Sequence, residues 1–166
     1  WNLNSTTSAP GNSSANSFSS PPEGKLWLAS APGGLTIGKL GVTTKFYGSG
    51  TILVEGHLVV DGPLVWDSQT RLGFLVKGNI TFTRTNDGKV GCGAFAAIGN
   101  NSDINFAMPD SKSGRLTGIF IAARNVSLPD PNLLTGIYEI FHDAYFAANP
   151  TVLFKELLKI VFTTSG

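Results

Sequence analysis

Few residues of this chain could carry acid–base or nucleophilic chemistry. Enzymes that cleave polysaccharides need clustered carboxylates, or carboxylates beside Arg or Lys, on one face of the fold. The sequence contains no Ser-His-Asp elbow, no Gly-rich phosphate loop and no His-x-x-x-His metal spacing. The groups left to consider are Glu55, His57, Asp61, Asp67, Arg71 and Lys77, with His142 and Asp143 as a second pair.

Several of these groups have a structural explanation instead. Glu55 and Lys77 occupy equivalent outward positions of the strand repeat described below, so we expect a surface ion pair between them. His142 and Asp143 are neighbours in the sequence, and such side chains point in different directions on a strand or a helix. Cys92, the single cysteine, is expected to be a small core residue. We therefore predict no catalytic residue, no cofactor and no metal site, and a protein that is not an enzyme.

The composition excludes some classes of partner. The 166 residues carry a formal net charge of +1, and 14% are charged, so no basic stripe is available for nucleic acid. No apolar run approaches the ~20 residues of a membrane span. The 20 Gly, 9 Pro and 42% apolar residues are typical of a turn-rich β protein.

Four apolar segments of the chain resemble one another. They start 20 to 25 residues apart, a period that indicates a solenoid, and they cover residues 51–60, 73–82, 93–106 and 118–128. Each contains two short strands with apolar positions two residues apart. The inward residues of the first two segments are predicted to stack, with Ile52, Val54, Leu58 and Val60 over Phe74, Val76, Ile80 and Phe82.

Gly56 and Gly78 separate the two strands of a unit, and we predict that a positive φ at these glycines makes a sharp corner. The pattern predicts a short right-handed parallel β-helix, with longer loops over 61–71, 83–91 and 107–116. An antiparallel β-sandwich or jelly roll is the alternative, because it also has many short strands and Gly-rich turns.

The segments 50–62, 72–82 and 118–128 resemble the short β-helix domains of bacterial surface and pilus-assembly-associated proteins, and more distantly the bactofilins. The stretch 143–150 is similar to an Asp-and-Asn-Pro stretch that follows the coils in several of those proteins. The resemblance covers about residues 35–150. It implies a β-helix fold and a scaffold role, and it carries over no catalytic residue.

The two ends differ in character from the repeats. Residues 1–24 form a polar, low-complexity arm or linker, in which Trp1, Leu3 and Phe18 are the large side chains and the expected anchors on another copy. Residues 25–166 are expected to form one domain, with coils over about 35–130 and a cap over about 131–166. In the cap, an amphipathic helix over 151–162 is predicted to cover the open end of the coils, although the β-forming residues 159–163 could also make a final strand.

Asn4, Asn12, Asn79, Asn100 and Asn125 are glycosylation sequons. With the low charge and the open-ended strands, they favour an extracellular or cell-surface structural protein. We expect a homo-oligomer or homopolymer, a subunit of a filament or layer that assembles through β-strand contacts, with a surface glycan as a further candidate partner. The alternative is a carbohydrate-binding or carbohydrate-cleaving β-helix domain.

Overall fold

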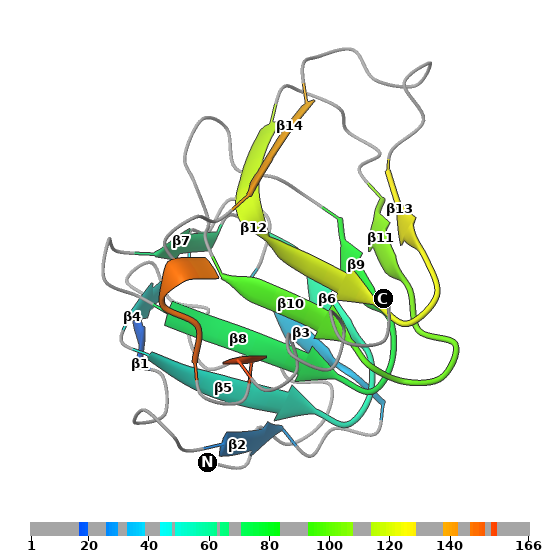
Figure 1. The fold of residues 1–166 in the computed structure, drawn as a ribbon, viewed down its shortest axis with the longest axis horizontal. Coiled ribbons are helices and arrows are strands. Elements are labelled where there is room, and N and C mark those ends of the chain that lie inside the picture. The colour runs from blue at the N-terminus through cyan, green and yellow to red at the C-terminus, as the bar shows by residue number, and fades with distance from the viewer. Residues whose placement is uncertain are drawn as a thin grey trace.

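The fold is described from a computed structural model (Figure 1). It describes residues 17–19, 26–29, 33–38, 44–47, 49–62, 64–66, 71–83, 93–107, 114–128, 138–142, 147–151 and 154–155. Within these ranges the chain is mainly β-structure, and no helix is long and apolar enough to cross a membrane.

The described strands form three sheets. The largest has the order β14 (Tyr138–His142), β12 (Gly114–Ala122), β10 (Ala94–Ala97), β8 (Arg71–Val76), β5 (Ser49–Val54) and β2 (Leu26–Ala29). The second has the order β13 (Val126–Ser127), β11 (Ile104–Phe106), β9 (Ile80–Phe82), β6 (Leu58–Val60) and β3 (Leu35–Ile37). The third contains β1 (Ser17–Ser19), β4 (Thr44–Tyr47) and β7 (Leu64–Trp66).

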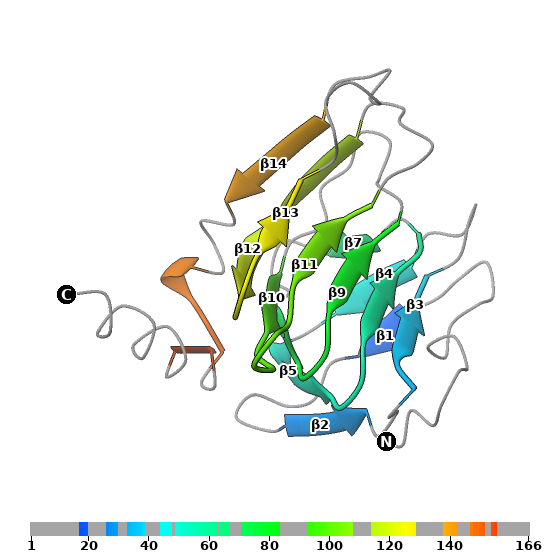
Figure 2. The same ribbon diagram turned by 90° about the vertical axis from the view of Figure 1, so that its right-hand side faces the viewer.

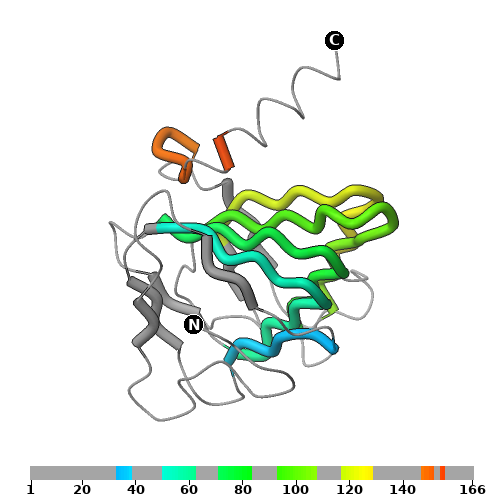
Figure 3. The backbone as a smooth tube through the Cα atoms, turned by 90° about the horizontal axis from the view of Figure 1, so that it is seen from below, coloured from blue at the N-terminus to red at the C-terminus, as the bar shows by residue number. Residues whose placement is uncertain are grey.

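Every strand pair among the described residues is parallel, so the antiparallel sandwich is wrong. The chain passes from a strand of the six-stranded sheet to a strand of the five-stranded sheet, and each return adds a strand beside the previous one (Figure 2). We call each such pair of successive strands a rung; the rungs are β2–β3, β5–β6, β8–β9, β10–β11 and β12–β13. In Figure 3 the coloured segments of these rungs lie in chain order, from blue 33–38 to yellow 117–128.

The core lies between the two larger sheets, and the predicted register is confirmed. Ile52 pairs with Phe74 and Val54 with Val76 in one sheet, while Leu58 pairs with Ile80 and Val60 with Phe82 in the other. All eight side chains are buried. Alternation of inward and outward side chains along each strand explains why these positions, two residues apart, face inward.

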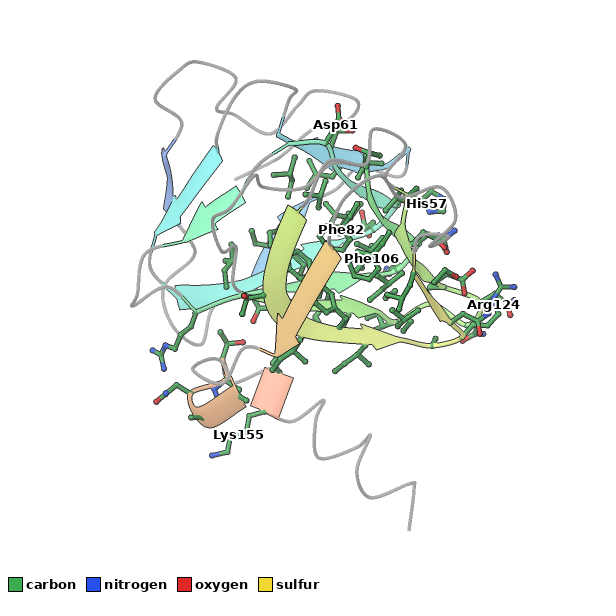
Figure 4. All side chains as sticks on the ribbon, turned by 90° about the horizontal axis from the view of Figure 1, so that it is seen from above. His57, Asp61, Phe82, Phe106, Arg124 and Lys155 are labelled. Atoms are coloured by element: carbon green, nitrogen blue, oxygen red, sulfur yellow. The ribbon has the colours of Figure 1, made fainter. Side chains whose placement is uncertain are left out.

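Phenylalanine rings fill the later rungs. The ring of Phe95 stacks between those of Phe74 and Phe120, with distances between ring centroids of 5.2 Å and 5.7 Å. It also forms an edge-to-face contact with Phe82, with the ring centroids 5.1 Å apart. Phe82 also stacks on Phe106 at 5.0 Å. Aromatic pairs of this kind contribute about 0.5–1.5 kcal/mol each beyond their buried area. Phe82 and Phe106 lie inside the fold in Figure 4.

The structure has more rungs than the repeat indicated. β2 and β3 form an earlier rung, with Leu26 paired to Thr51 and Leu35 to Leu58. β7 lies within the segment 61–71 and β12 begins at Gly114, so these two predicted loops are partly strand. The alternation in β2 and β3 is too short to match the longer repeated segments, and this is why the rung was missed.

The described residues near the C-terminus lie on a sheet face. Phe154 is fully buried and packs with Ala94 and Ala96, and the Thr151 hydroxyl lies 2.9 Å from the Thr51 hydroxyl of β5. Residues 154–155 are helical, and the Lys155 N–H donates to the Thr151 carbonyl. These residues therefore contact the outer face of the six-stranded sheet, whereas the helix was expected at the open end. Residues 156–163 lie outside the described residues.

The N-terminal arm contributes a strand to its own chain. In β1, Phe18 pairs with Phe46 of β4. Residues 17–19 thus pair within their own chain, whereas the arm was expected to be ordered against another copy; docking of the arm on another copy stays a prediction. Trp1 and Leu3 lie outside the described residues.

Candidate functional site: a polar ladder at the strand corners

The two larger sheets are joined by short corners, which cover 55–57, 77–79, 98–103 and 123–125. Backbone hydrogen bonds continue from rung to rung through them. The N–H groups of Leu58, Ile80 and Ile104 donate to the carbonyls of the next corners, Asn79, Asp103 and Asn125, each at 2.9 Å. Backbone donors that would otherwise lack a partner at the strand ends are satisfied in this way.

Side chains at the same corner add a second set of bonds. The N–H of Asn79 donates to Nδ1 of His57 at 2.9 Å, and the N–H of Asp103 donates to Oδ1 of Asn79 at 3.0 Å. The N–H of Asn125 donates to Oδ1 of Asp103 at 3.1 Å. We call these four residues the polar ladder. The side chains of His57, Asn79 and Asp103 each accept a backbone donor of the following rung, and Asn125 supplies the last of these donors.

The predicted positive φ at the corner glycines is wrong. Neither Gly56 nor Gly78 has a positive φ. A Cβ on Gly78 would lie 2.7 Å from Nδ1 of His57 and 2.8 Å from the carbonyl oxygen of Gly56. Close approach between successive rungs therefore explains the glycine at position 78. Gly34, which precedes β3 as His57 precedes β6, does have a positive φ of 107°.

The corner 98–103 is longer than the others, and polar contacts hold it to the rung before. The Ser102 hydroxyl donates to the Lys77 carbonyl at 2.9 Å, and the Ser102 N–H donates to the Gly99 carbonyl at 2.9 Å. A Cβ on Gly99 would stand 1.9 Å from the Lys77 carbonyl oxygen. The extra residues thus project outward while Asp103 keeps its place in the polar ladder.

Asp103 and Arg124 form the strongest charged contact at this corner. Nε of Arg124 donates to Oδ1 of Asp103 at 2.9 Å, and Nη2 donates to Oδ2. This two-point contact is the geometry in which guanidinium and carboxylate bind most strongly. The hydrogen bond from Arg124 is the main cause that lowers the pKa of Asp103 below its ordinary value. The same contact raises the pKa of Arg124.

Sequence reasoning missed Asp103 and Arg124 as a pair. Their signal was available in the repeat, because Asp103 precedes Ile104 as Asn79 precedes Ile80. The insertion in corner 98–103 hid this equivalence.

The candidate catalytic groups have separate structural partners. Lys77 Nζ lies 3.7 Å from Glu55 Oε1, with the two side chains 55% and 32% exposed, so the predicted surface ion pair is present. The Asp61 carboxylate accepts a hydrogen bond from the Thr83 hydroxyl at 2.5 Å, at the far ends of β6 and β9. In Figure 4, Asp61 lies on a different side of the fold from His57 and Arg124.

The remaining candidates are not brought to this corner. Arg71 begins β8, at the opposite end of that strand from Lys77. His142 ends β14, while Asp67, Cys92 and Asp143 lie outside the described residues. Within the described ranges, no group of three His, Cys, Asp or Glu side chains could hold a metal ion.

Three of the five sequons share the corner. Asn100 and Asn125 are exposed, whereas Asn79 is half-buried and its side-chain oxygen accepts the Asp103 N–H. Asn4 and Asn12 lie outside the described residues. The corner therefore offers two accessible acceptors, at positions 100 and 125.

A row of outward side chains runs across the five-stranded sheet. The pairing of neighbouring strands places one residue of each strand in this row. The side chains of these residues point away from the core, because side chains alternate between the two faces of a sheet. The row contains Thr36, Val59, Thr81, Asn105 and Ser127.

The last rung is open. Val126 and Leu128 are 45% and 65% exposed, whereas residues aligned with Val126 on earlier strands, such as Ile80 and Ile104, are fully buried. β13 is also a terminal strand of its sheet, with β11 as its neighbour. An apolar surface beside a strand edge that no described strand pairs is a place where another strand can bind.

Comparison with known proteins gives no match to the chain among family models, curated proteins or solved structures.

Proposed function

We propose that the chain is a short right-handed parallel β-helix and serves as a structural subunit of an extracellular filament or surface layer, assembled through β-strand contacts. Parallel pairing of every described strand, and the alternation of the chain between two sheets, support the β-helix. The resemblance to β-helix domains of bacterial surface proteins points to the same role.

The open last rung is the observation that carries the proposed assembly. Inward positions are buried in the earlier rungs because a following rung covers them. Among the described strands none follows β13, and Val126 and Leu128 are exposed, so apolar surface and backbone donors and acceptors face outward together. A second strand at this edge would remove both from water.

The exposed acceptors at positions 100 and 125 support a location outside the cell, because N-linked glycans are attached to surface loops of secreted proteins.

Electron microscopy and light scattering of the purified full chain over a concentration series test this function. Ordered polymers or sheets, with a mass that rises with concentration, are expected. Monomers at every concentration would contradict the proposal.

Carbohydrate binding is the second candidate, and the outward row on the five-stranded sheet favours it. Thr81, Asn105 and Ser127 lie on successive strands, and Thr36 lies beyond Val59; the hydroxyl or amide groups of these four residues could bond sugar hydroxyls. Thermal stabilisation by a panel of polysaccharides, lost in a Thr81→Ala, Asn105→Ala variant, would support this function. Equal melting temperatures with and without every saccharide would exclude it for that panel.

A further inference from the structure

We propose that two copies of the chain join through their open last rungs, about a two-fold axis that passes near Ser127 and Ile121. The inference rests on the proposed function, and it names the surface and the partner of one of its strand contacts. A two-fold contact joins only two copies, so a filament or layer also needs a second contact between such dimers. The two strands of the last rung would run antiparallel to those of the other copy, β13 against β13 and the part of β12 beyond β14 against β12.

The two ends of the stack differ, and this selects the partner surface. In the first rung, Leu35 and Ile37 are 3% and 1% exposed, so that end of the core is covered. In the last rung, Val126 and Leu128 are exposed, and Phe120 and Ala122 are only partly buried. An open end that stacks on a covered end would gain little apolar burial, whereas two open ends cover each other.

Backbone groups at the open end point outward in a pattern that fits itself. Ile104 donates its N–H to Asn125 on the next rung, and Val126 occupies the same position on β13, so the Val126 N–H points to the open side. Because backbone groups two residues apart on a strand point to the same side, the N–H and C=O groups of Leu128 also point to the open side. Antiparallel pairing about Ser127 sets Val126 of one copy opposite Leu128 of the other, with hydrogen bonds between them.

β12 has the matching arrangement. Its Ile119 and Ala123 donate their N–H groups back to the β10 rung, at Gly93 and Ala97. The alternate residues, Phe120 and Ala122, therefore point to the open side and can pair with each other about Ile121. β14 covers β12 only at 114–118, so the edge at 119–122 is free among the described residues.

One axis can serve both sheets. The Phe120 ring lies 5.3 Å from the Phe106 ring, across the core. Ile104 pairs with Val126, so Leu128, two residues later, lies beside Phe106, which is two residues after Ile104. Leu128 therefore lies on the side of the core opposite Phe120. Ser127 and Ile121, each one residue away, then face each other across the rung, as a single two-fold axis requires.

A single cysteine tests this geometry. Residues that face each other across an antiparallel pair without mutual hydrogen bonds have Cα atoms about 4.5 Å apart, within disulfide range. In a Cys92→Ser background, the full chain with Ser127→Cys should form a disulfide-linked dimer under mild oxidation. Asn105→Cys, on the same outward row but one rung inside, is the matched control and should stay unlinked.

A second variant removes the contact without a new thiol. Val126→Lys puts a charge into the buried part of the interface and should lower the linked fraction of Ser127→Cys by about tenfold or more. Because Val126 is exposed in the single chain, the melting temperature of the monomer should change little.

The outcomes separate the two proposals. Assembly by electron microscopy without a Ser127→Cys link would overturn the two-fold contact and leave the proposed function standing. A link between Ser127→Cys and Thr36→Cys in a mixture of two variants would show head-to-tail stacking and also overturn it. A chain that remains monomeric at every concentration would overturn both.

Discussion

The ring of Phe154 occupies the space that a side chain on Gly73 would need. A Cβ at Gly73 would lie 2.2 Å from Cε2 and 2.4 Å from Cδ2 of Phe154. These two residues are more than eighty positions apart in the sequence, and the Phe154 ring packs against β8 at the position where Gly73 has no side chain.

This fit predicts a large effect of Phe154→Ala. Removal of a fully buried ring should lower the free energy of unfolding by about 3–5 kcal/mol. Lys155→Ala, the exposed neighbour, is the control and should change it by less than ~0.5 kcal/mol. Urea denaturation followed by circular dichroism measures both. Equal effects of the two substitutions on the free energy of unfolding would show that Phe154 does not pack against the sheet.

The corner glycine should be intolerant of a side chain because of close approach. Gly78→Ala places a Cβ within 2.8 Å of the Gly56 carbonyl oxygen and should cost about 1–3 kcal/mol of unfolding free energy. Gly33→Ala is the matched control, since a Cβ there would meet nothing within 4 Å. Thermal melting compares them, and a Gly78→Ala variant as stable as Gly33→Ala would contradict the close contact between rungs.

The Asp103–Arg124 contact should make stability depend on pH. The folded pKa of Asp103 is lowered, so its contribution is present above the ordinary value of 3.8 and is lost as pH falls through the lowered pKa. Asp103→Asn should therefore lower the melting temperature at pH 7, and the difference from wild type should shrink in strong acid. Glu55→Gln is the control, because its ion pair with Lys77 is exposed. A difference that is constant with pH would argue against the charged contact.

The stacked rings predict a further core effect. Phe95→Ala removes contacts with Phe74, Phe82 and Phe120 at once and should cost about 3–5 kcal/mol. Thr81→Ala, on the outward side of β9, should cost much less. Should chemical denaturation give Phe95→Ala near wild-type stability, Phe95 would not lie in the core as described.

The sequence by itself determined which residues of the rungs face inward. Strand alternation and the repeat of about 22 residues were enough to align Ile52 with Phe74 and Leu58 with Ile80, because each depends on local spacing and on burial of one face. The ion pair between Glu55 and Lys77 followed from the same alignment.

Only the tertiary structure decided how the rungs touch at their corners and where Phe154 packs. The role of Gly78 depends on the distance to His57 in the rung before, and the bond between Asp103 and Arg124 depends on an insertion whose path local spacing does not define. Phe154 could be assigned to an apolar face from its sequence, but its partner Gly73 could not. Such contacts join distant segments, and composition and periodicity carry no information on which surfaces meet.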